Sequence, residues 1–242
     1  MIVLGIETAT AVCAVALVDD DVVRAERRYE IPQAHSEKLM ECVDDCLKSA
    51  GLVLSSIDGI AVSIGPGSFT GLRIGLSVAK GLAFAADKPL IGVPTLEALA
   101  VQPVRKGVAE TDDVIVPMID ARRDEVYIAL FRRHEKNVEQ MLPSQAVRCA
   151  EAISILSGHR RVILVGDGAD KFYHYYSQSE LNNNLRVLQP DRDLQSCSAI
   201  DVAGRGVLKF RNGDRDNMNT LEPMYIKDFY TTAKPQQFSV ES

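Results

Sequence analysis

The first thirty residues alternate apolar runs with short polar turns, which is the pattern of consecutive β-strands. Apolar runs of strand length cover residues 2–8 and 12–18, and the small turn Thr8-Ala9-Thr10 lies between them. Asp19-Asp20-Asp21 forms a second polar turn before a third strand over residues 22–31. The chain is therefore predicted to open as a three-stranded meander.

Helices and strands alternate after this meander. Apolar residues at helical spacing predict three helices, over residues 36–50, 70–86 and 96–101. Short apolar runs predict two further strands, over residues 57–64 and 90–93. Ser36 and Thr95 are the expected caps of the first and third helices, and Gly51 lies where a helix commonly ends. This order is typical of an α/β unit.

A polar connector over residues 104–113 precedes a second series of elements. Its predicted strands cover residues 114–119, 126–131 and 161–165. Its predicted helices cover residues 148–157, 169–177 and 197–211. The second part of the chain therefore begins, like the first, with two strands joined by a turn.

The two parts can be superposed in sequence. A shift of 113 residues, since 119 − 6 = 113, places Ile6-Glu7 on Ile119-Asp120 and Val15-Ala16-Leu17 on Ile128-Ala129-Leu130. Chance similarity between two apolar hairpins explains such a match, and so does internal duplication of an α/β unit. Duplication predicts a protein of two related halves.

Composition and charge narrow the class of protein. The chain has 242 residues, 46% of them hydrophobic, which is ordinary for a globular protein. Its 27 basic and 33 acidic residues give a net charge of −6, which argues against a domain that binds nucleic acid through its own charge. No apolar run approaches the roughly 18–20 residues that span a bilayer, so no membrane segment is expected.

Cysteine and histidine usage points to a reducing compartment and to no metal site. The five cysteines form no CxxC motif, and Cys42 and Cys46 lie four residues apart on one face of a predicted helix. Free cysteines in such a position behave as small apolar residues. The four histidines are scattered without metal-ligand spacing. We therefore expect a cytoplasmic protein with no metal of its own.

A glycine-rich loop, Gly65-Pro66-Gly67-Ser68-Phe69-Thr70, lies between a predicted strand and a predicted helix. That position suits an anion, because the first N–H groups of a helix are unpaired. The spacing matches neither the dinucleotide-binding fingerprint nor a Walker A loop. The alternative is a tight turn in which Ser68 or Thr70 caps the helix.

The helix after this loop carries Gly71, Gly75, Ala79 and Ala83 at intervals of four residues. Each glycine inside a helix costs roughly 0.8–1 kcal/mol relative to alanine, so two of them indicate close approach of another backbone. That backbone belongs either to the chain's own sheet or to a helix of a partner subunit. The opposite face of the helix can serve the core through Leu72, Leu76 and Leu82.

Glu7 and Asp120 are candidate paired carboxylates if the duplication is real, because in a nucleotide enzyme they would position a metal-bound water. The turns that follow them lack the glycines that let backbone approach a phosphate. The chain also contains no GxSxG or HExxH motif. No catalytic residue is therefore assigned, and these turns are interpreted as eroded phosphate loops.

Five segments together resemble the bacterial TsaB (YeaZ) family, and they occur in order over nearly the whole chain. They are Ile6 to Thr10, Gly65 to Gly81, Pro117 to Tyr127, Gly166 to Ala169 and Glu222 to Lys227. The resemblance implies a duplicated actin/Hsp70-like ATPase (ASKHA) fold in the α/β class. We place its two halves at residues 1–103 and 104–242, with the C-terminal helix able to pack back on the first half.

The resemblance implies a non-catalytic relative of TsaD, the subunit that transfers threonylcarbamoyl to an adenosine beside the tRNA anticodon. Such a chain pairs with TsaD, works with the ATPase TsaE and forms homodimers when alone. It reaches tRNA only indirectly through the complex, needs no membrane and holds no cofactor of its own. ATP or ADP at the junction with TsaD is a further expectation.

The resemblance also assigns candidate residues. Its partner surface is formed by the helices over residues 36–50 and 70–86, through His35, Leu39, Val43, Cys46, Gly71, Gly75, Val78, Ala79 and Leu82. The junction nucleotide is expected near Gly65, Pro66, Gly67, Ser68, Phe69, Thr70 and Arg73. The vestigial phosphate-loop positions are Glu7, Thr8, Asp120 and Arg122.

On this hypothesis Gly75→Leu blocks pairing with TsaD and leaves the fold intact. Two alternatives stay open beside it. A small ATPase or sugar kinase of the same fold would need intact phosphate loops in both halves. A peptidase, a label given to relatives of the family, would need a nucleophile and a base that the sequence does not offer.

Overall fold

The computed structural model describes residues 1–30, 35–179, 186–188 and 192–227. The first half of the chain supplies β1 (Ile2–Glu7), β2 (Cys13–Asp19), β3 (Val22–Tyr29), α1 (His35–Ala50), β4 (Gly59–Gly65), α2 (Phe69–Ala86), β5 (Leu90–Pro94) and α3 (Thr95–Arg105). The second half supplies β6 (Val114–Asp120), β7 (Glu125–His134), β8 (Asn137–Arg148), α4 (Cys149–Leu156), β9 (Arg161–Val165), α5 (Gly168–Ser177), β10 (Arg186–Leu188) and α6 (Ala199–Arg211).

The two halves build sheets of one topology. The first sheet has the order β3-β2-β1-β4-β5, and the second has the corresponding order β8-β7-β6-β9-β10. In each sheet the first three strands form an antiparallel meander and the fourth pairs in parallel with the first. This correspondence, strand by strand, is what duplication predicts, and it confirms the duplicated α/β fold.

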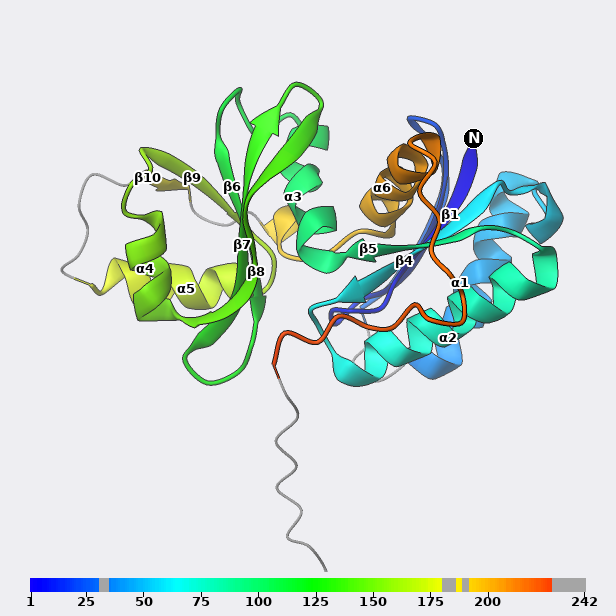
Figure 1. Cartoon of the computed structure of the whole chain (residues 1–242), viewed down its shortest axis with the longest axis horizontal. Helices are drawn as coiled ribbons and strands as arrows, with labels where there is room; N and C mark the ends of the chain where they lie inside the picture. The colour runs from blue at the N-terminus through cyan, green and yellow to red at the C-terminus, as the bar shows by residue number, and fades with distance from the viewer. Residues whose placement is uncertain (31–34, 180–185, 189–191, 228–242) are drawn as a thin grey trace, which may run out of the picture.

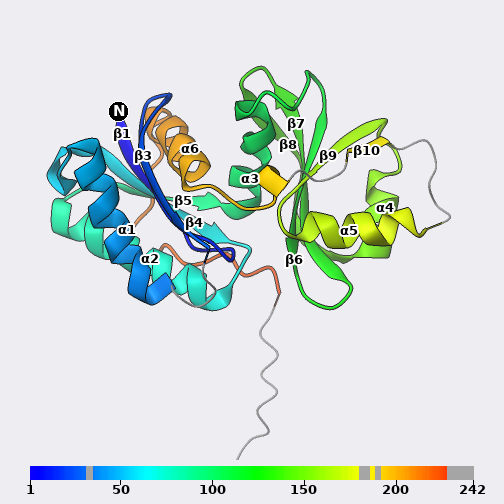
Figure 2. The same ribbon diagram turned by 180° about the vertical axis from the view of Figure 1, so that it is seen from behind.

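Helices cover both faces of each sheet (Figures 1 and 2). Helices α1 and α2 pack on the outer face of the first sheet, around a core that includes Leu4, Ile6 and Leu39. Helices α4 and α5 pack in the same way on the second sheet, around Met118 and Phe172. Helices α3 and α6 lie between the sheets, where a third core joins the halves.

The two central helices are exchanged between the halves. Helix α3 follows the first sheet in sequence but lies against β6, whereas α6 follows the second sheet and lies on β1 and β4. In each of the two helices the third residue is acidic and the eleventh residue is basic. Asp201 of α6 pairs with Arg105 of α3 at 2.7 Å, and Glu97 of α3 lies 3.6 Å from Lys209 of α6. This reciprocity defines an antiparallel helix pair with approximate two-fold symmetry.

Close approach of α6 to the first sheet depends on small residues. A Cβ added at Gly5 of β1 would lie 2.7 Å from the backbone nitrogen of Ala203, and still closer to the carbonyl oxygen of Ala199. A Cβ added at Gly59 would lie 2.6 Å from the ring of Phe210. A Cβ added at Gly206 of α6 would lie 2.5 Å from the Cβ of Ala61. The helix therefore sits nearer the sheet than larger side chains would allow.

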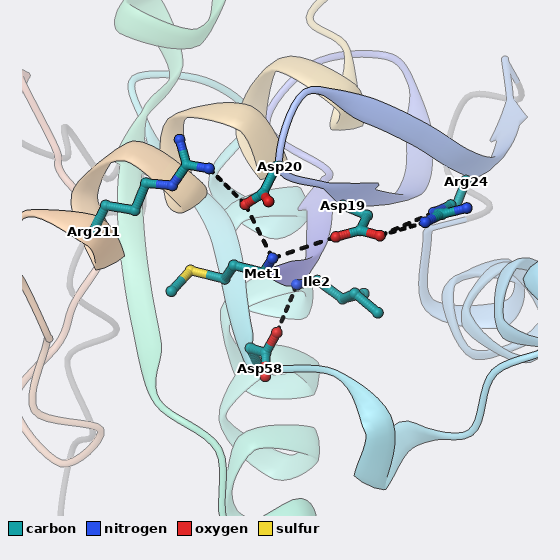
Figure 3. Close-up of polar contacts among 7 residues, drawn as sticks. All are labelled: Met1, Ile2, Asp19, Asp20, Arg24, Asp58 and Arg211. Atoms are coloured by element: carbon teal, nitrogen blue, oxygen red, sulfur yellow. Dashed lines mark hydrogen bonds and ion pairs between the residues drawn. The ribbon is translucent and has the colours of Figure 1, made fainter.

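The amino terminus joins β1 to the last turn of α6 (Figure 3). The Met1 ammonium lies 3.0 Å from the carboxylate of Asp20 and 3.3 Å from that of Asp19. Arg211, in the last turn of α6, lies 2.7 Å from Asp20. The Met1 N–H groups and the Arg211 guanidinium thus share one carboxylate in the β2–β3 turn.

Several expectations about individual elements need correction. The sequence pattern missed β8 and β10, and the third helix runs past Pro103 to Arg105. Helix α1 begins at His35, so Ser36 lies inside its first turn. Thr95 is the first residue of α3 rather than its cap, and its hydroxyl accepts a hydrogen bond from the Gly65 N–H at 3.1 Å.

Other local predictions are confirmed. Ser68 caps α2, because its hydroxyl accepts a hydrogen bond from the Gly71 N–H at 3.3 Å. Gly51 follows α1 with φ +66°, the left-handed conformation that glycine adopts without strain. All five cysteines are buried, and none of them is in a disulfide. The division at residues 103 and 104 stays a prediction, and that boundary falls inside α3.

Gly5→Ala tests whether α6 needs this close approach. Because the added methyl group meets backbone rather than a flexible side chain, we expect the free energy of unfolding to fall by about 1–3 kcal/mol. Gly204→Ala on α6 is the matched control, since a Cβ there meets nothing within 4 Å. It should raise stability by up to about 1 kcal/mol through helix propensity. Equal urea midpoints for the two variants would contradict the packing described above.

Candidate functional site

The β1–β2 turn is closed by the side chain of Glu7. One carboxylate oxygen of Glu7 accepts hydrogen bonds from the Ala9 N–H at 2.7 Å and the Thr10 N–H at 3.1 Å. The Glu7 side chain is fully buried. Burial raises the pKa of this carboxyl above its ordinary value of 4.5, and hydrogen bonds from Ser63, Cys197 and the turn amides partly oppose that shift.

The β6–β7 turn is closed by Asp120 in a comparable way. One Asp120 oxygen accepts a hydrogen bond from the Arg122 N–H at 2.6 Å, and the same oxygen pairs with Lys171 of α5. The Ala121 N–H donates to the Glu125 carbonyl at 3.1 Å. Arg122 and Arg123 follow with φ of +67° and +51°, two successive left-handed residues in a turn without glycine.

Glu7 and Asp120 do not form a pair, because they occupy opposite faces of equivalent strands. Ile6 pairs with Val15, and the matching pair in the second sheet is Met118 with Ile128. The repeat is therefore shifted by 113 residues in the second strands but by 112 in the first. A shift of one residue turns a strand's side chains to the other face. Asp120 corresponds to Thr8, not to Glu7.

The two turns do not fit a nucleotide phosphate. A phosphate loop offers unpaired backbone N–H groups, whereas these N–H groups already donate to Glu7, Asp120 and Glu125. The expected carboxylate pair across a cleft is also wrong, since Glu7 is buried and Asp120 is exposed. Across the described ranges, no three His, Cys, Asp or Glu side chains gather where they could hold a metal.

The loop from Gly65 to Thr70 is bonded to the chain's own β1–β2 turn. The Ser68 N–H donates to the Ala9 carbonyl at 2.6 Å, and the Thr8 hydroxyl donates to the Gly71 carbonyl at 2.8 Å. A Cβ at Gly67 would meet the Ala9 carbonyl inside van der Waals contact. This geometry supports the capped tight turn, because the Gly71 N–H in the first turn of α2 donates to the Ser68 hydroxyl and the loop itself is bonded to Ala9.

The glycine stripe of α2 faces the chain's own sheet. A Cβ at Gly71 would collide with the Thr8 carbonyl oxygen, and one at Gly75 would collide with the Thr8 hydroxyl. The close approach that the stripe indicates is therefore internal. Gly75→Leu would disturb the fold itself, so the expectation of an intact fold in that variant is wrong.

Most other residues assigned to the partner surface lie in the core. Leu39, Val43, Cys46 and Ala79 are buried between the helices and the first sheet. Val78 and Leu82 are half-buried at the edge of that core, and the side chain of His35 lies outside the described residues. Helical spacing identified the faces of α1 and α2 that pack internally.

The outward face of α2 carries a second stripe that the sequence reasoning missed. Ser77, Gly81 and Ala85 follow one another at intervals of four and are exposed, and a Cβ at Gly81 would meet nothing within 4 Å. Phe84 beside them is 80% exposed. The same four-residue spacing could have revealed this stripe, two residues out of phase with Gly71, Gly75 and Ala79.

Helix α2 is also the one described helix long and apolar enough to cross a membrane by length and composition alone. Arg73 and Lys80 lie within this helix, so it is not an unbroken apolar run of that length. Leu72, Leu76 and Ala83 of α2 pack on the first sheet, so such a helix also serves as part of a globular core. Phe84, a large apolar residue of α2 that is exposed, lies instead beside the outward stripe.

A C-terminal segment, residues 214–227, follows α6 and connects both halves. The Asp216 N–H donates to the Leu90 carbonyl at 3.0 Å, and the Met224 N–H donates to the Ile64 carbonyl at 2.6 Å. Lys227 then reaches the β6–β7 turn, where it lies 2.5 Å from the Glu125 carboxylate. We call these residues the strap.

The strap and α2 meet at Arg73. Its Nε donates to the Tyr225 hydroxyl at 3.1 Å, and its guanidinium lies 3.5 Å from the centre of the Phe69 ring. Phe69 and Tyr225 have ring centroids 5.3 Å apart. Phe69 and Arg73, two of the seven residues expected near a junction nucleotide, are thus engaged with the strap, and Arg73 remains exposed.

Two sheets of one topology with exchanged third helices define an actin-like ATPase (ASKHA) fold, and comparisons with known proteins agree. The ROK hexokinase of Thermus thermophilus matches with a TM-score of 0.51 at 12% identity, over 88% of this chain and 100% of that one. YeaZ from Pseudomonas aeruginosa matches with a TM-score of 0.75 at 26% identity, over 93% of this chain and 99% of that one.

Sequence comparison narrows the class to one family. A family model for TsaD, described as tRNA N6-adenosine threonylcarbamoyltransferase, matches residues 30–204. The tRNA threonylcarbamoyladenosine biosynthesis protein TsaB of Escherichia coli K12 is 32% identical over 94% of this chain and 95% of its own length. The TsaB of Bacillus subtilis 168 is 34% identical over 68% of this chain and 69% of its own. The chain belongs to the TsaB family.

Glu7→Gln tests whether the buried carboxyl closes the turn at a cost in stability. Because burial raises the pKa of Glu7 in the folded state, ionisation above pH 4.5 is less favourable there than in the unfolded chain. The wild type should therefore lose stability relative to Glu7→Gln as the pH rises from 4.5 to 8.

Urea unfolding of both proteins across this pH range gives the measurement. Glu139→Gln, at an exposed position, serves as the control. The wild type should not lose stability relative to this variant as the pH rises from 4.5 to 8. A constant difference between wild type and Glu7→Gln at every pH would contradict this account of the turn.

Proposed function

We propose that the chain is a non-catalytic subunit in the synthesis of threonylcarbamoyladenosine in tRNA. In this proposal it binds the catalytic subunit TsaD, and with it the ATPase TsaE, and forms a homodimer when TsaD is absent. The names of its relatives support the pathway. The observation that carries the subunit role is the outward stripe of α2, an exposed apolar face on a helix that otherwise belongs to the core.

The two vestigial phosphate turns support a role without catalysis of its own. The N–H groups of Ala9 and Thr10 in one vestigial phosphate turn, and of Ala121 and Arg122 in the other, donate within the chain and are not available to grip a phosphate. Catalysis and any metal therefore belong to TsaD in this proposal. A nucleotide at the junction would be held chiefly by the partner, with Arg73 as the nearest exposed cation of this chain among the assigned loop residues.

The stripe has the properties of a helix-docking surface. Ser77, Gly81 and Ala85 carry small side chains that let a second backbone approach, and Phe84 can enter a pocket of the partner. Met40 is a further half-exposed apolar residue, on α1, the helix that packs beside α2. A tRNA-modifying complex works where tRNA is, so the proposal places the chain in the cytoplasm.

Gly81→Leu tests the docking face without touching the core. Since a Cβ at Gly81 meets nothing within 4 Å, the fold should persist, and replacing a helical glycine should not lower the melting temperature. We expect binding to TsaD to weaken at least about tenfold, because interface energy concentrates in a few central residues. Isothermal titration with purified TsaD measures the change.

Gly204→Leu is the matched control, because Gly204 is also a helical glycine with open space beside it but lies on α6. It should bind TsaD as the wild type does. A Gly81→Leu protein that is folded and binds TsaD with unchanged affinity would exclude the outward face of α2 as the docking surface.

The pathway itself is tested in the source cell. Depletion of the chain should reduce threonylcarbamoyladenosine in total tRNA, measured by mass spectrometry of nucleosides, and re-expression of the wild type should restore it. Unchanged levels after depletion would refute the proposed function. ATP turnover or peptide cleavage by the purified chain alone would instead favour one of the enzymatic alternatives.

A further inference from the structure

The β6–β7 turn places two arginine side chains in solvent at an energetic cost. Arg122 and Arg123 both adopt left-handed backbone conformations, which cost roughly 1–2 kcal/mol per residue for side chains larger than glycine. Asn and Gly are the residues that such turn positions favour. Residues held in unfavourable conformations concentrate at functional sites. The strained turn is therefore a candidate binding site, with the two guanidinium groups as its contacting atoms.

The structure holds the turn rigidly and leaves the guanidinium groups open. Asp120 and Glu125 brace its backbone, and Lys171 and Lys227 in turn neutralise these two carboxylates. Both arginines are exposed. Within residues 1–30, 35–179, 186–188 and 192–227, neither guanidinium has a carboxylate or hydrogen-bond partner. The remaining acid of the turn, Asp124, lies 3.9 Å from Arg148.

The strap continues this positive charge onto the first half of the molecule. Lys227 donates to the Ala121 carbonyl at 3.1 Å, beside the two arginines. Two residues earlier, Tyr225 bonds to Arg73, whose guanidinium lies over the Phe69 ring. Arg73 has no carboxylate partner in the described part of the chain. We call Arg73, Tyr225, Lys227, Arg122 and Arg123 the basic stripe.

The stripe suits an extended polyanion rather than a single phosphate group. Its three arginines without carboxylate partners lie on both halves of the molecule, and the strap between them carries a tyrosine ring that is 42% exposed. Single-stranded and loop RNA is recognised by guanidinium groups on its backbone and by aromatic rings on which bases stack. A chain with net charge −6 offers such a combination only locally.

We propose that the basic stripe contacts the phosphodiester backbone of the substrate tRNA directly, while the catalytic partner holds the anticodon. This inference rests on the proposed function, because that function supplies the RNA. It departs from the expectation that tRNA reaches this chain only through its partner. The charge of the whole chain still implies that the stripe adds to RNA binding by the complex and does not bind RNA tightly alone.

The test uses the complex of this chain with TsaD and TsaE and an unmodified tRNA transcript. Fluorescence anisotropy over a range of KCl concentrations gives the dissociation constant and its salt dependence. Arg122→Gln/Arg123→Gln should weaken binding about tenfold and lower the slope of log K against log[salt] by about 1.4–1.8, the loss of two phosphate contacts. Arg122→Lys/Arg123→Lys should recover most of the salt dependence.

A second variant separates a role in RNA binding from a role in the fold. Arg122→Asn/Arg123→Gly relieves the left-handed strain and should raise the melting temperature by a few degrees, while weakening tRNA binding as much as the glutamine variant does. A turn with a merely structural role would show the first effect without the second. All variants should bind TsaD normally, because neither arginine belongs to α2, which carries the outward stripe.

Arg132→Gln/Arg133→Gln is the matched control, because it removes two arginines from the opposite end of β7. Wild-type affinity and salt slope in the Arg122/Arg123 glutamine variant, or an equal loss in the control, would overturn the proposal. Transfer activity of the wild-type complex is measured in parallel. An inactive wild-type complex would refute the proposed function, whereas an active complex with unaltered variants would refute the stripe alone.

Discussion

The exchange of α3 and α6 between the two sheets ties the halves of the molecule into one core. Each helix belongs in sequence to one sheet and packs on the other, so neither half can complete its core alone. The reciprocal acid–base pairs set the register of the two helices. Asp201 is almost fully buried, and removing its partner Arg105 would leave a buried charge at a cost of about 3–5 kcal/mol.

This exchange explains why the strap can act on both halves. Since α6 returns the chain to the first sheet, the residues that follow it begin at β5 and run past the start of α2 before they reach the β6–β7 turn. Arg73 and Lys227 therefore lie on one path although they are far apart in sequence. The positions of the turn, the strap and the start of α2 are set together rather than separately.

The sequence predicted the architecture well, because burial on one face of a helix or strand leaves a periodic pattern. It predicted contact partners less well. The stripe of Gly71 and Gly75 showed that a backbone comes close, but only the fold identifies it as the Thr8 turn. The spacing of Ser77, Gly81 and Ala85 marks a second stripe on the same helix, but only the structure shows that the space beside Gly81 is open. The exposed edge strand β8 was missed, because most of its residues are not buried and it lacks a clear apolar alternation.

The one-residue offset between the halves shows why the candidate site was harder to predict than the fold. Glu7 and Asp120 align in sequence, yet strand pairing assigns them to opposite faces. Glu7 consequently became a buried clamp for its own turn, whereas Asp120 remained at the surface beside Lys171.

The two halves also differ in net charge, and this difference bears on what each half can contact. In residues 1–103 there are eight basic and thirteen acidic residues, while residues 104–242 hold nineteen basic and twenty acidic residues. Nearly all of the net negative charge therefore lies in the half that carries the outward stripe of α2. The nearly neutral half, with an exposed Asp120 to brace the turn, can present Arg122 and Arg123 to an anion without strong repulsion from its surroundings. Two turns at equivalent places in the halves thus differ: the β1–β2 turn is closed by a buried glutamate, whereas the β6–β7 turn is at the surface and carries two exposed arginines.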